Sequence, residues 1–155
     1  MATTIVVLDG DQTGQELLEE ALRVIDPGVV RLDLTLDRYD LGLEHRRATK
    51  NQVVYDAGAG IRKHRLALKA ATITPPEKDD VGSPNRILRE EMQAEVILRT
   101  GRRIPGVRPI GGVYAPISVV RMARDDAYGA PEWREGEPGS ADELAFRTER
   151  ISRRV

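Results

Sequence analysis

The chain begins with a short apolar run that leads through a glycine-containing turn into a segment of helical periodicity, and this order most constrains its fold. The run from Thr4 to Leu8 is rich in β-branched residues and ends at Asp9-Gly10-Asp11, as a buried strand followed by a turn does. From Thr13 to Ile25 apolar residues recur at helical spacing, and Asp26-Pro27-Gly28 ends that pattern. The sequence therefore predicts a strand followed directly by a helix.

The same alternation continues further along the chain. Residues 30–36 alternate apolar and polar side chains as a half-buried strand does, residues 49–63 predict a second helix, and residues 66–73 predict another strand. This β-α-β-α-β order predicts an α/β fold with a mostly parallel sheet flanked by helices. Aromatic residues make up only 4% of the chain, so the core must consist of Val, Ile, Leu and Ala.

The second part of the chain has weaker signals. Residues 74–82 have the composition of a loop, and Ser83-Pro84 then predicts a helix that ends near Met92, because serine is a preferred N-cap and proline is favoured at the first helical position. Residues 94–99 and 116–121 are expected to form strands that each end in an arginine. We expect residues 122–140 to be irregular and a last helix to start near Ala141.

Composition excludes several classes of protein. The net charge is -1 and acidic residues balance basic ones along the chain, so we expect no nucleic-acid partner. The absence of cysteine excludes disulfides and thiolate chemistry. No stretch approaches the ~20 apolar residues of a membrane span, and the first residues do not resemble a signal peptide. We therefore expect a cytoplasmic protein without a membrane partner.

The start of the predicted helix at Ser83 is a candidate anion site. A helix N-terminus presents free N–H groups at the positive end of the helix dipole, and Asn85 and Arg89 share one face of this helix. Arg99 and Arg121, at two strand ends, are expected to converge on the same point. A single arginine is more often a solvated surface residue, but several arginines aimed at one point need an anion between them. The natural occupant is a ligand with two or three carboxylates.

At this point the sequence resembles a known family. The series Ser83-x-Asn85-x-x-Leu88-Arg89, Arg99, Arg121 and Tyr128 resembles the isocitrate/isopropylmalate dehydrogenases, which are metal-dependent β-decarboxylating dehydrogenases, and is most similar to the isocitrate branch. The run from Gly10 to Glu16 is similar to the family's opening Gly-Asp-Gly-Ile-Gly-Pro-Glu. Thr72–Pro76 resembles the family's loop beside the nicotinamide, and residues 121–133 resemble the segment that contains the family's catalytic tyrosine.

The resemblance implies roles for these residues. Ser83 and Asn85 would bind the carboxylate that distinguishes isocitrate-like substrates, and the other carboxylates would be bound by Arg89, Arg99 and Arg121. Tyr128 would be the catalytic residue that protonates the enol left after decarboxylation. The ordinary tyrosine pKa near ~10 suits an acid that must keep its proton at neutral pH until that step. Thr74 would lie beside the nicotinamide cofactor. Residues 1–94 would form half of the large α/β domain, and residues 95–155 would form the start of the small domain and a dimer-contact helix.

The sequence also departs from the family pattern. Gln12-Thr13 and Gln15 replace Gly-Ile and Pro in the opening motif, and Ala70-Ala71 stands where the family usually has Gly-Pro. After Arg121, Met122-Ala123-Arg124 replaces the family's Glu-Asn-Ser/Thr, which changes the polar surroundings expected for the catalytic tyrosine. Adjacent carboxylates such as Asp79-Asp80 are usually solvated, so we expect no metal site in this chain alone.

The resemblance further implies that this chain supplies only one half of an active site. In the family, a second half contributes a catalytic lysine, the aspartates that hold Mg²⁺ or Mn²⁺, and the adenosine site. We therefore expect NAD or NADP and the metal to bind only in a completed complex, with either a complementary dehydrogenase-half subunit or another copy of this chain. Alone, the chain should be inactive as a dehydrogenase. Two alternatives remain open: a carboxylate-binding or regulatory protein without redox chemistry, and an inert remnant.

Overall fold

The computed structural model describes residues 2–77, 79–125, 127 and 130–153. The chain divides into two compact units, Met1–Gln93 (unit 1) and Ala94–Val155 (unit 2), and each is described by itself. The assignment of residues 1–94 and 95–155 to a large-domain half and the start of a small domain stays a prediction.

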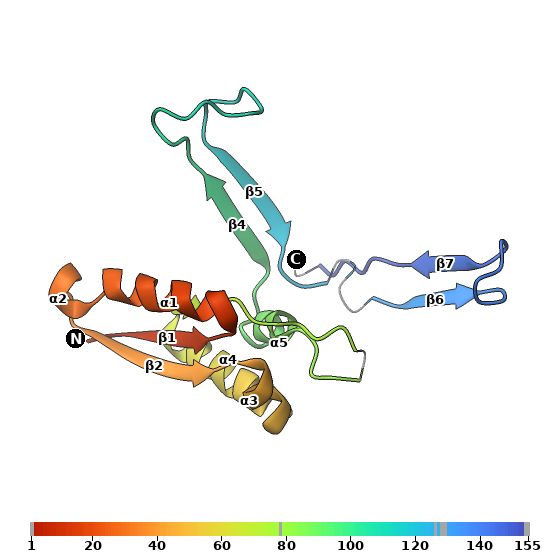
Figure 1. Ribbon diagram of the computed structural model, residues 1–155, viewed down its shortest axis with the longest axis horizontal. Coiled ribbons are helices and arrows are strands. Elements are labelled where there is room, and N and C mark those ends of the chain that lie inside the picture. The colour runs from red at the N-terminus through yellow and green to blue at the C-terminus, as the bar shows by residue number, and fades with distance from the viewer. Residues whose placement is uncertain (1, 78, 126, 128–129, 154–155) are drawn as a thin grey trace. The chain divides into compact units, whose positions relative to one another are not determined.

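Unit 1 contains a parallel sheet. Its strands are β1 (Thr3–Asp9), β2 (Leu34–Asp40) and β3 (Ala67–Lys69), and β1 lies in the middle of the order β2-β1-β3 (Figure 1). Both neighbours run parallel to β1, with Val7 opposite Arg38 on one side and Leu68 on the other. This arrangement confirms the predicted α/β class, and it places the carboxyl ends of the strands at one edge of the sheet.

Helices cover both faces of this sheet. On one face α1 (Gln12–Val24) packs against β1 in a cluster with these buried members: Val7, Leu18, Leu22 and Ala70. On the other face lie α4 (Gln52–His64) and α5 (Pro84–Glu91), with a larger cluster that includes Val6, Leu8, Leu41, Val54, Ala57, Ile61, Ile87 and Leu88. Alternate residues of β1 therefore enter opposite clusters, as the two-residue period of a strand requires.

Several predicted boundaries in unit 1 are wrong. The side chain of Asp26 accepts a hydrogen bond from Gly28 N at 2.8 Å, and Pro27 starts a one-turn helix, α2 (Pro27–Val30), so the strand expected from Val30 begins only at Leu34. The short helix α3 (Leu43–Ala48) was not predicted. The strand expected over residues 66–73 is limited to β3, because the chain leaves the sheet after Ala70 and turns past the start of α1.

Unit 2 contains two antiparallel ribbons. The first pairs β4 (Val96–Gly101) with β5 (Ile117–Met122), which confirms the two predicted strands, although each continues past its arginine. Its register sets Ile97 opposite Arg121 and Arg99 opposite Val119. The hydroxyls of Thr100 and Ser118, 3.0 Å apart, bridge the two strands of this ribbon.

The second ribbon corrects the prediction of a last helix from about Ala141. Residues there form β7 (Leu144–Arg147), which pairs with β6 (Glu132–Glu135) in a hairpin. Leu144, Phe146 and Thr148 alternate with smaller or charged residues, so this segment has the period of a strand as well as a thin helical stripe. Trp133 stacks on Phe146 directly opposite, with ring centroids 5.0 Å apart. The predicted dimer-contact helix is therefore absent from the described residues.

Unit 2 leaves apolar side chains of both ribbons exposed. On one face of the β4–β5 ribbon lie Ile117 and Val119, and on the other lie Leu98 and Val120, which are 65% and 68% exposed. Among the described residues of this unit, Ala123 is the one buried hydrophobic residue. In the part of the chain that the structure describes, no helix is long and apolar enough to cross a membrane.

Candidate functional site

The start of α5 carries the first group of predicted site residues. Ser83 is the N-cap of this helix and has extended backbone angles, but its side chain makes no capping hydrogen bond. Asn85 and Arg89, one turn apart, are both half-buried, while Ile87 and Leu88 between them are buried in the core. The helix is thus anchored by its apolar face. Its start combines N–H groups, a serine hydroxyl and an amide, and Arg89 adds a guanidinium one turn further along. This combination suits an anion.

Arg99 and Arg121 lie together in unit 2. Since Ile97 is opposite Arg121 and Arg99 is two residues further along β4, the two arginines occupy diagonal positions on the same face of the ribbon. Diagonal neighbours of this kind are roughly 7–8 Å apart, which is within reach of one anion for long side chains. The convergence of these two arginines with Ser83, Asn85 and Arg89 on one ligand stays a prediction. Tyr128 lies outside the described residues.

The opening motif shows why glycine is needed at two positions. A side chain at Gly10 would collide with the carbonyl oxygen and carbon of Ala71, and a Cβ at Gly14 would lie 2.8 Å from the nitrogen of Ala71. The backbone nitrogen of Asp11 also donates to the carbonyl of Ala71 at 2.9 Å. The turn after β1 and the chain after β3 therefore touch at the carboxyl edge of the sheet, where open parallel sheets hold their ligands.

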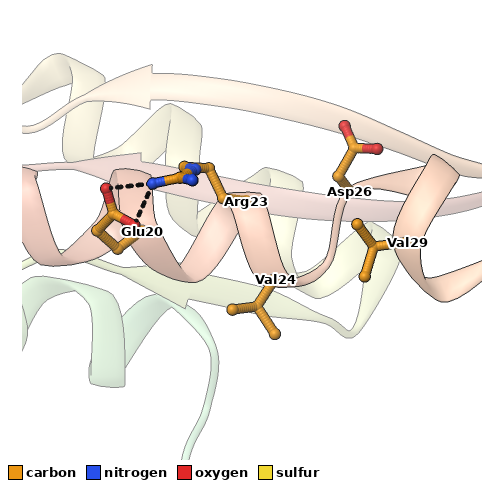
Figure 2. A pocket seen from close by; sticks show the side chains of 5 residues that line it. All are labelled: Glu20, Arg23, Val24, Asp26 and Val29. Atoms are coloured by element: carbon orange, nitrogen blue, oxygen red, sulfur yellow. Dashed lines mark hydrogen bonds and ion pairs between the residues drawn. The ribbon is translucent and has the colours of Figure 1, made fainter.

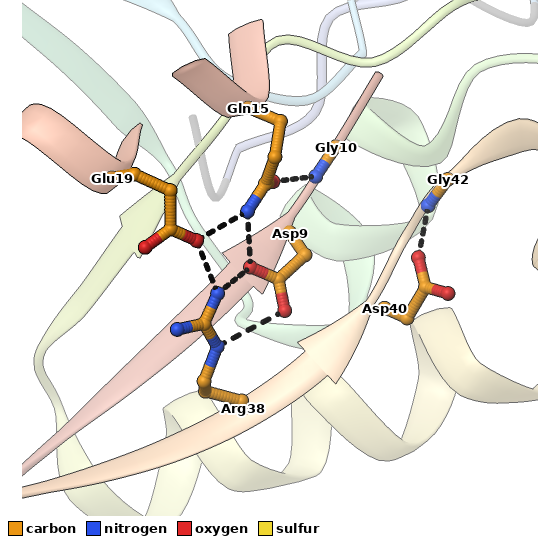
Figure 3. A network of polar contacts seen from close by, with 7 residues as sticks. All are labelled: Asp9, Gly10, Gln15, Glu19, Arg38, Asp40 and Gly42. Carbon is orange, nitrogen blue, oxygen red and sulfur yellow. Dashed lines mark hydrogen bonds and ion pairs between the residues drawn. The ribbon is translucent and has the colours of Figure 1, made fainter. Parts of the chain in front are cut away.

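The departures in this motif have local consequences. Gln12, at a position where the family has glycine, adopts a left-handed φ of 50°, which costs energy for a residue with a side chain. Gln15, in place of proline, accepts a hydrogen bond from Gly10 N at 2.9 Å and donates to Asp9 and Glu19 (Figure 3). The replacement of proline thus adds polar contacts that close the turn.

Arg38 joins the same network from β2. Its guanidinium contacts the carboxylates of Asp9 and Glu19, each at 2.6 Å, and so connects two strands with α1 (Figure 3). The hydrogen bond to Asp9, followed by that to Glu19, raises the pKa of Arg38 above its ordinary value. Because its charge is already matched by these carboxylates, Arg38 is a structural ion-pair residue here and not an anion-binding one.

The segment from Ala70 to Gly82 has no helix or strand in its described residues, yet side chains hold it in place. Asn51 Nδ2 donates to the carbonyl of Val81 at 2.7 Å, and Arg47 pairs with Asp80 at 2.6 Å. This ion pair lowers the pKa of Asp80 below its ordinary value. Thr74, predicted to lie beside a nicotinamide, is exposed in this segment. Its exposed hydroxyl is compatible with contact to a bound cofactor.

Lys69 is an ionisable group that the sequence did not single out. Its Nζ donates to the carbonyl of Ala70 at 2.8 Å and to the hydroxyl of Thr72 at 2.9 Å. Burial, and secondly the positive charge of Arg46, lower the pKa of Lys69 to about 8, although Asp11 acts in the opposite direction. Nothing in the pattern Ala67-Leu68-Lys69 signals this, because the burial comes from residues distant in sequence.

Two surface hollows of unit 1 are lined by residues other than those predicted to bind a ligand. One is beside the last turn of α1 and α2, where Arg23 pairs with Glu20, and is lined by Glu20, Arg23, Val24, Asp26 and Val29 (Figure 2). It is at the opposite edge of the sheet from the turn after β1. Another is lined by Arg47, Lys50, Asn51, Asp79, Asp80 and Val81. Within the described residues, no group of three or more His, Asp or Glu side chains is arranged to hold a metal ion.

The parallel sheet, the glycine turn and the helix that starts at Ser83 together define an α/β protein, and the start of this helix is its candidate anion site. The sequence matches the isocitrate/isopropylmalate dehydrogenase family over residues 4–155. The chain belongs to this family.

Individual relatives agree with this assignment. The chain is 37% identical over 147 residues to isocitrate dehydrogenase (NADP) 1 of Mycobacterium tuberculosis, a match that covers 88% of the chain and 35% of that protein. It is 36% identical over 152 residues to the mitochondrial isocitrate dehydrogenase (NADP) of Candida tropicalis, covering 92% of the chain and 34% of that protein. The chain thus spans about a third of the length of these curated relatives.

Proposed function

We propose that this chain is the substrate-binding part of an isocitrate-dehydrogenase-like oxidoreductase and that it binds a 2-hydroxy polycarboxylate, isocitrate or a related tricarboxylate. The observation that carries the proposal is the start of α5, where the hydroxyl of Ser83 is not used as a cap and Asn85 and Arg89 share one side of the helix. The named activity of the relatives supports isocitrate as the first ligand to test.

The paired arginines of unit 2 support the same class of ligand. Arg99 and Arg121 lie on one face of the ribbon, and guanidinium groups form charge-assisted hydrogen bonds with carboxylates. With Arg89 they provide a cation for each carboxylate of a tricarboxylate. Ser83 and Asn85 then hold the carboxylate by which isocitrate differs from smaller hydroxy acids.

The proposed chemistry assigns one proton transfer to this chain. The hydroxyl of Tyr128 donates its proton to the enol left after decarboxylation, and Thr74 lies against the nicotinamide. When bound, NAD or NADP would supply a hydride acceptor, and Mg²⁺ or Mn²⁺ would supply charge that polarises a carbonyl. The catalytic lysine, the metal ligands and the nucleotide site lie outside residues 1–155 in this proposal, and a complementary subunit that supplies them would form a split dehydrogenase with this chain.

One observation favours a second function, carboxylate binding without redox chemistry. Arg121 is followed by Met122-Ala123-Arg124 instead of the family's polar residues, and Ala123 is buried, with its nitrogen bonded to the carbonyl of Glu95 at 2.9 Å. A small apolar side chain at this position cannot take part in a proton-transfer network. Under this alternative, the protein senses the concentration of a carboxylate or has a regulatory role that depends on that concentration.

Calorimetric titration with isocitrate, citrate and chloride tests the binding. Because a hydrogen bond to a charged group contributes about 1.5–3 kcal/mol, Arg121→Ala should weaken isocitrate binding at least about tenfold. Arg147→Ala, which removes an exposed arginine from β7, is the control and should leave affinity unchanged. Equal binding of all three ligands would refute the site.

Turnover separates the two functions. The purified chain should not oxidise isocitrate with either cofactor, with or without Mg²⁺, whereas the chain with its complementary subunit should, and Tyr128→Phe should then remove most of the activity. Robust turnover by the 155-residue protein alone would refute the half-site assignment.

Partner binding can be followed by sedimentation. The outer strands of the described sheet are β2 and β3, and the ribbons of unit 2 expose apolar side chains, so we expect association with another copy or a complementary subunit. A protein that remains monomeric at high concentration, and with every candidate subunit tested, would contradict this part of the proposal.

A further inference from the structure

Arg46 is the one fully buried charged side chain among the described residues, and it forms no ion pair within them. It lies on α3 and is 0% exposed. Its guanidinium donates to carbonyl oxygens from different parts of the chain: Leu41 at 2.9 Å, Ile73 at 2.5 Å and Gly82 at 3.0 Å. Burial lowers the pKa of Arg46, and the nearby charge of Asp11 offsets part of this effect. A buried charge of this kind is retained only where its hydrogen bonds are satisfied.

Asp11 holds the same segment from the other side. One carboxylate oxygen accepts from the backbone nitrogen of Leu43 at 2.9 Å, and the other accepts from that of Ile73 at 2.8 Å. The backbone N–H and C=O of Ile73 are therefore both bonded to charged side chains, although this residue belongs to no helix or strand. Charged partners make these bonds stronger than ordinary backbone ones.

The two fixed points are direct neighbours of residues proposed to contact ligands. Ile73 immediately precedes Thr74, and Gly82 immediately precedes Ser83. Because Ser83 makes no side-chain capping bond, the contact between Arg46 and the carbonyl of Gly82 fixes the chain directly before the helix. A segment without a helix or strand samples many conformations when nothing holds it, and ordering each of its residues costs conformational entropy.

We infer that Arg46 and Asp11 are positioning residues that fix Thr74 and the start of α5 in the geometry needed for ligand binding. The identity of the ligand in this inference rests on the proposed function. The fixation of residues 73 and 82 by Asp11 and Arg46 does not depend on which ligand binds. The fork of arginine is required because a lysine ammonium cannot reach carbonyls that lie in several directions with fixed geometry. A purely structural role would lower stability and leave the affinity of the folded protein unchanged.

The test combines amide hydrogen exchange with isocitrate titration of the full chain. Asp11→Ala removes the acceptor of the Ile73 amide, and Arg46→Lys removes the fork while keeping the charge. Asp40→Ala is the matched control, because Asp40 accepts from Gly42 N at 2.8 Å at the same edge of the sheet (Figure 3) and has no hydrogen bond to the described residues of the segment 70–82. Exchange in β1 and α4 monitors the fold of each variant.

In the wild type the Ile73 amide should exchange as slowly as the amides of β1. In Asp11→Ala it should exchange at least about tenfold faster while β1 and α4 keep their protection, and isocitrate affinity should fall about tenfold in both variants, as loss of preorganisation predicts. Asp40→Ala should change neither quantity more than about twofold.

Unchanged affinity in a folded Asp11→Ala or Arg46→Lys protein would overturn the inference. If the wild type binds no isocitrate, the proposed function is refuted, and hydrogen exchange alone then tests whether Asp11 fixes the segment. Equal exchange of the Ile73 amide in wild type and Asp11→Ala would overturn the fixation. Faster exchange in Asp11→Ala would support it. Should Arg46→Lys not fold, Asp11→Ala carries the same test.

Discussion

Unit 1 buries apolar side chains on both faces of its sheet, whereas unit 2 exposes those of both its ribbons. Leu8 of β1 is 1% exposed and Leu98 of β4 is 65% exposed, although both are leucines on strands. Unit 1 has helices to cover the sheet, and in unit 2 the described residues form ribbons without a covering layer. A two-stranded ribbon is marginally stable in water unless something packs on it.

This difference divides the candidate site. Ser83, Asn85 and Arg89 stand on a helix anchored by buried Ile87 and Leu88, so their positions follow from the core of unit 1. Arg99 and Arg121 stand on a ribbon that exposes apolar side chains on both faces. We therefore expect the first group to be organised in the chain alone and the second to depend on what covers the ribbon.

The largest expected effect comes from truncating equivalent leucines in the two units. Leu8→Ala should lower the free energy of unfolding by about 2–5 kcal/mol, because it creates a cavity in the core. Leu98→Ala should change it by less than about 0.5 kcal/mol, because the side chain is already in water. Urea unfolding measures both, and similar losses for the two variants would show that unit 2 has a core of its own.

Sequence patterns predicted unit 1 better than unit 2 for a physical reason. The strand at Thr4–Leu8 and the helices near Thr13 and Ser83 have strong periodicity and capping or turn residues, and each is confirmed. The helix expected from Ala141 is wrong because only cross-strand pairing with residues around Trp133 decides between a thin helical stripe and a strand. Pairing partners distant in sequence are not visible in local periodicity.

The same limit applies to the candidate site. The arginines on the ribbon were predicted as strand-end residues, but their shared face follows only from the register of β4 and β5. Arg46 was missed altogether, because Arg46 and Arg47 look alike in sequence and only the fold buries one of them. Burial of a charge depends on which segments pass over it, which no local pattern records.

A smaller effect should appear in the pH dependence of stability, since the interior of unit 1 perturbs the pKa of a lysine. The pKa of Lys69 is lowered to about 8, so between about pH 8 and its unfolded pKa near 10.4 the unfolded chain binds more protons and wild-type stability should rise with pH. Allowing for solvent screening, the rise should be about 1–2 kcal/mol.

Urea unfolding at several pH values measures this rise as a difference from Lys69→Met, which lacks the titrating group. Lys63→Met, in the exposed last turn of α4, is the control and should behave as the wild type does. Parallel pH profiles for wild type and Lys69→Met would show that Lys69 is solvated.

The smallest effect concerns the turn that joins β1 to α1. Gln12→Gly should raise the stability of unit 1 by about 0.5 kcal/mol, because glycine adopts the left-handed φ of 50° without strain and this gain exceeds its extra entropy in the unfolded chain. Thr13→Gly, at the next helical position, should instead lower stability by up to about 1 kcal/mol. Thermal unfolding distinguishes the two signs, and a loss in both variants would mean that Gln12 is not strained.

The most direct test of the contrast between the units uses the single tryptophan of the chain. Trp133 lies in the second ribbon of unit 2, stacked on Phe146 and 46% exposed, so its fluorescence reports on unit 2. The helices of the described residues all belong to unit 1, so far-ultraviolet circular dichroism reports mainly on unit 1. Both signals are followed in one urea titration of the isolated chain. We predict that the fluorescence transition occurs at clearly lower urea than the dichroism transition, whereas coincident transitions with one midpoint would contradict the account, because they would mean that the two units unfold as one cooperative structure.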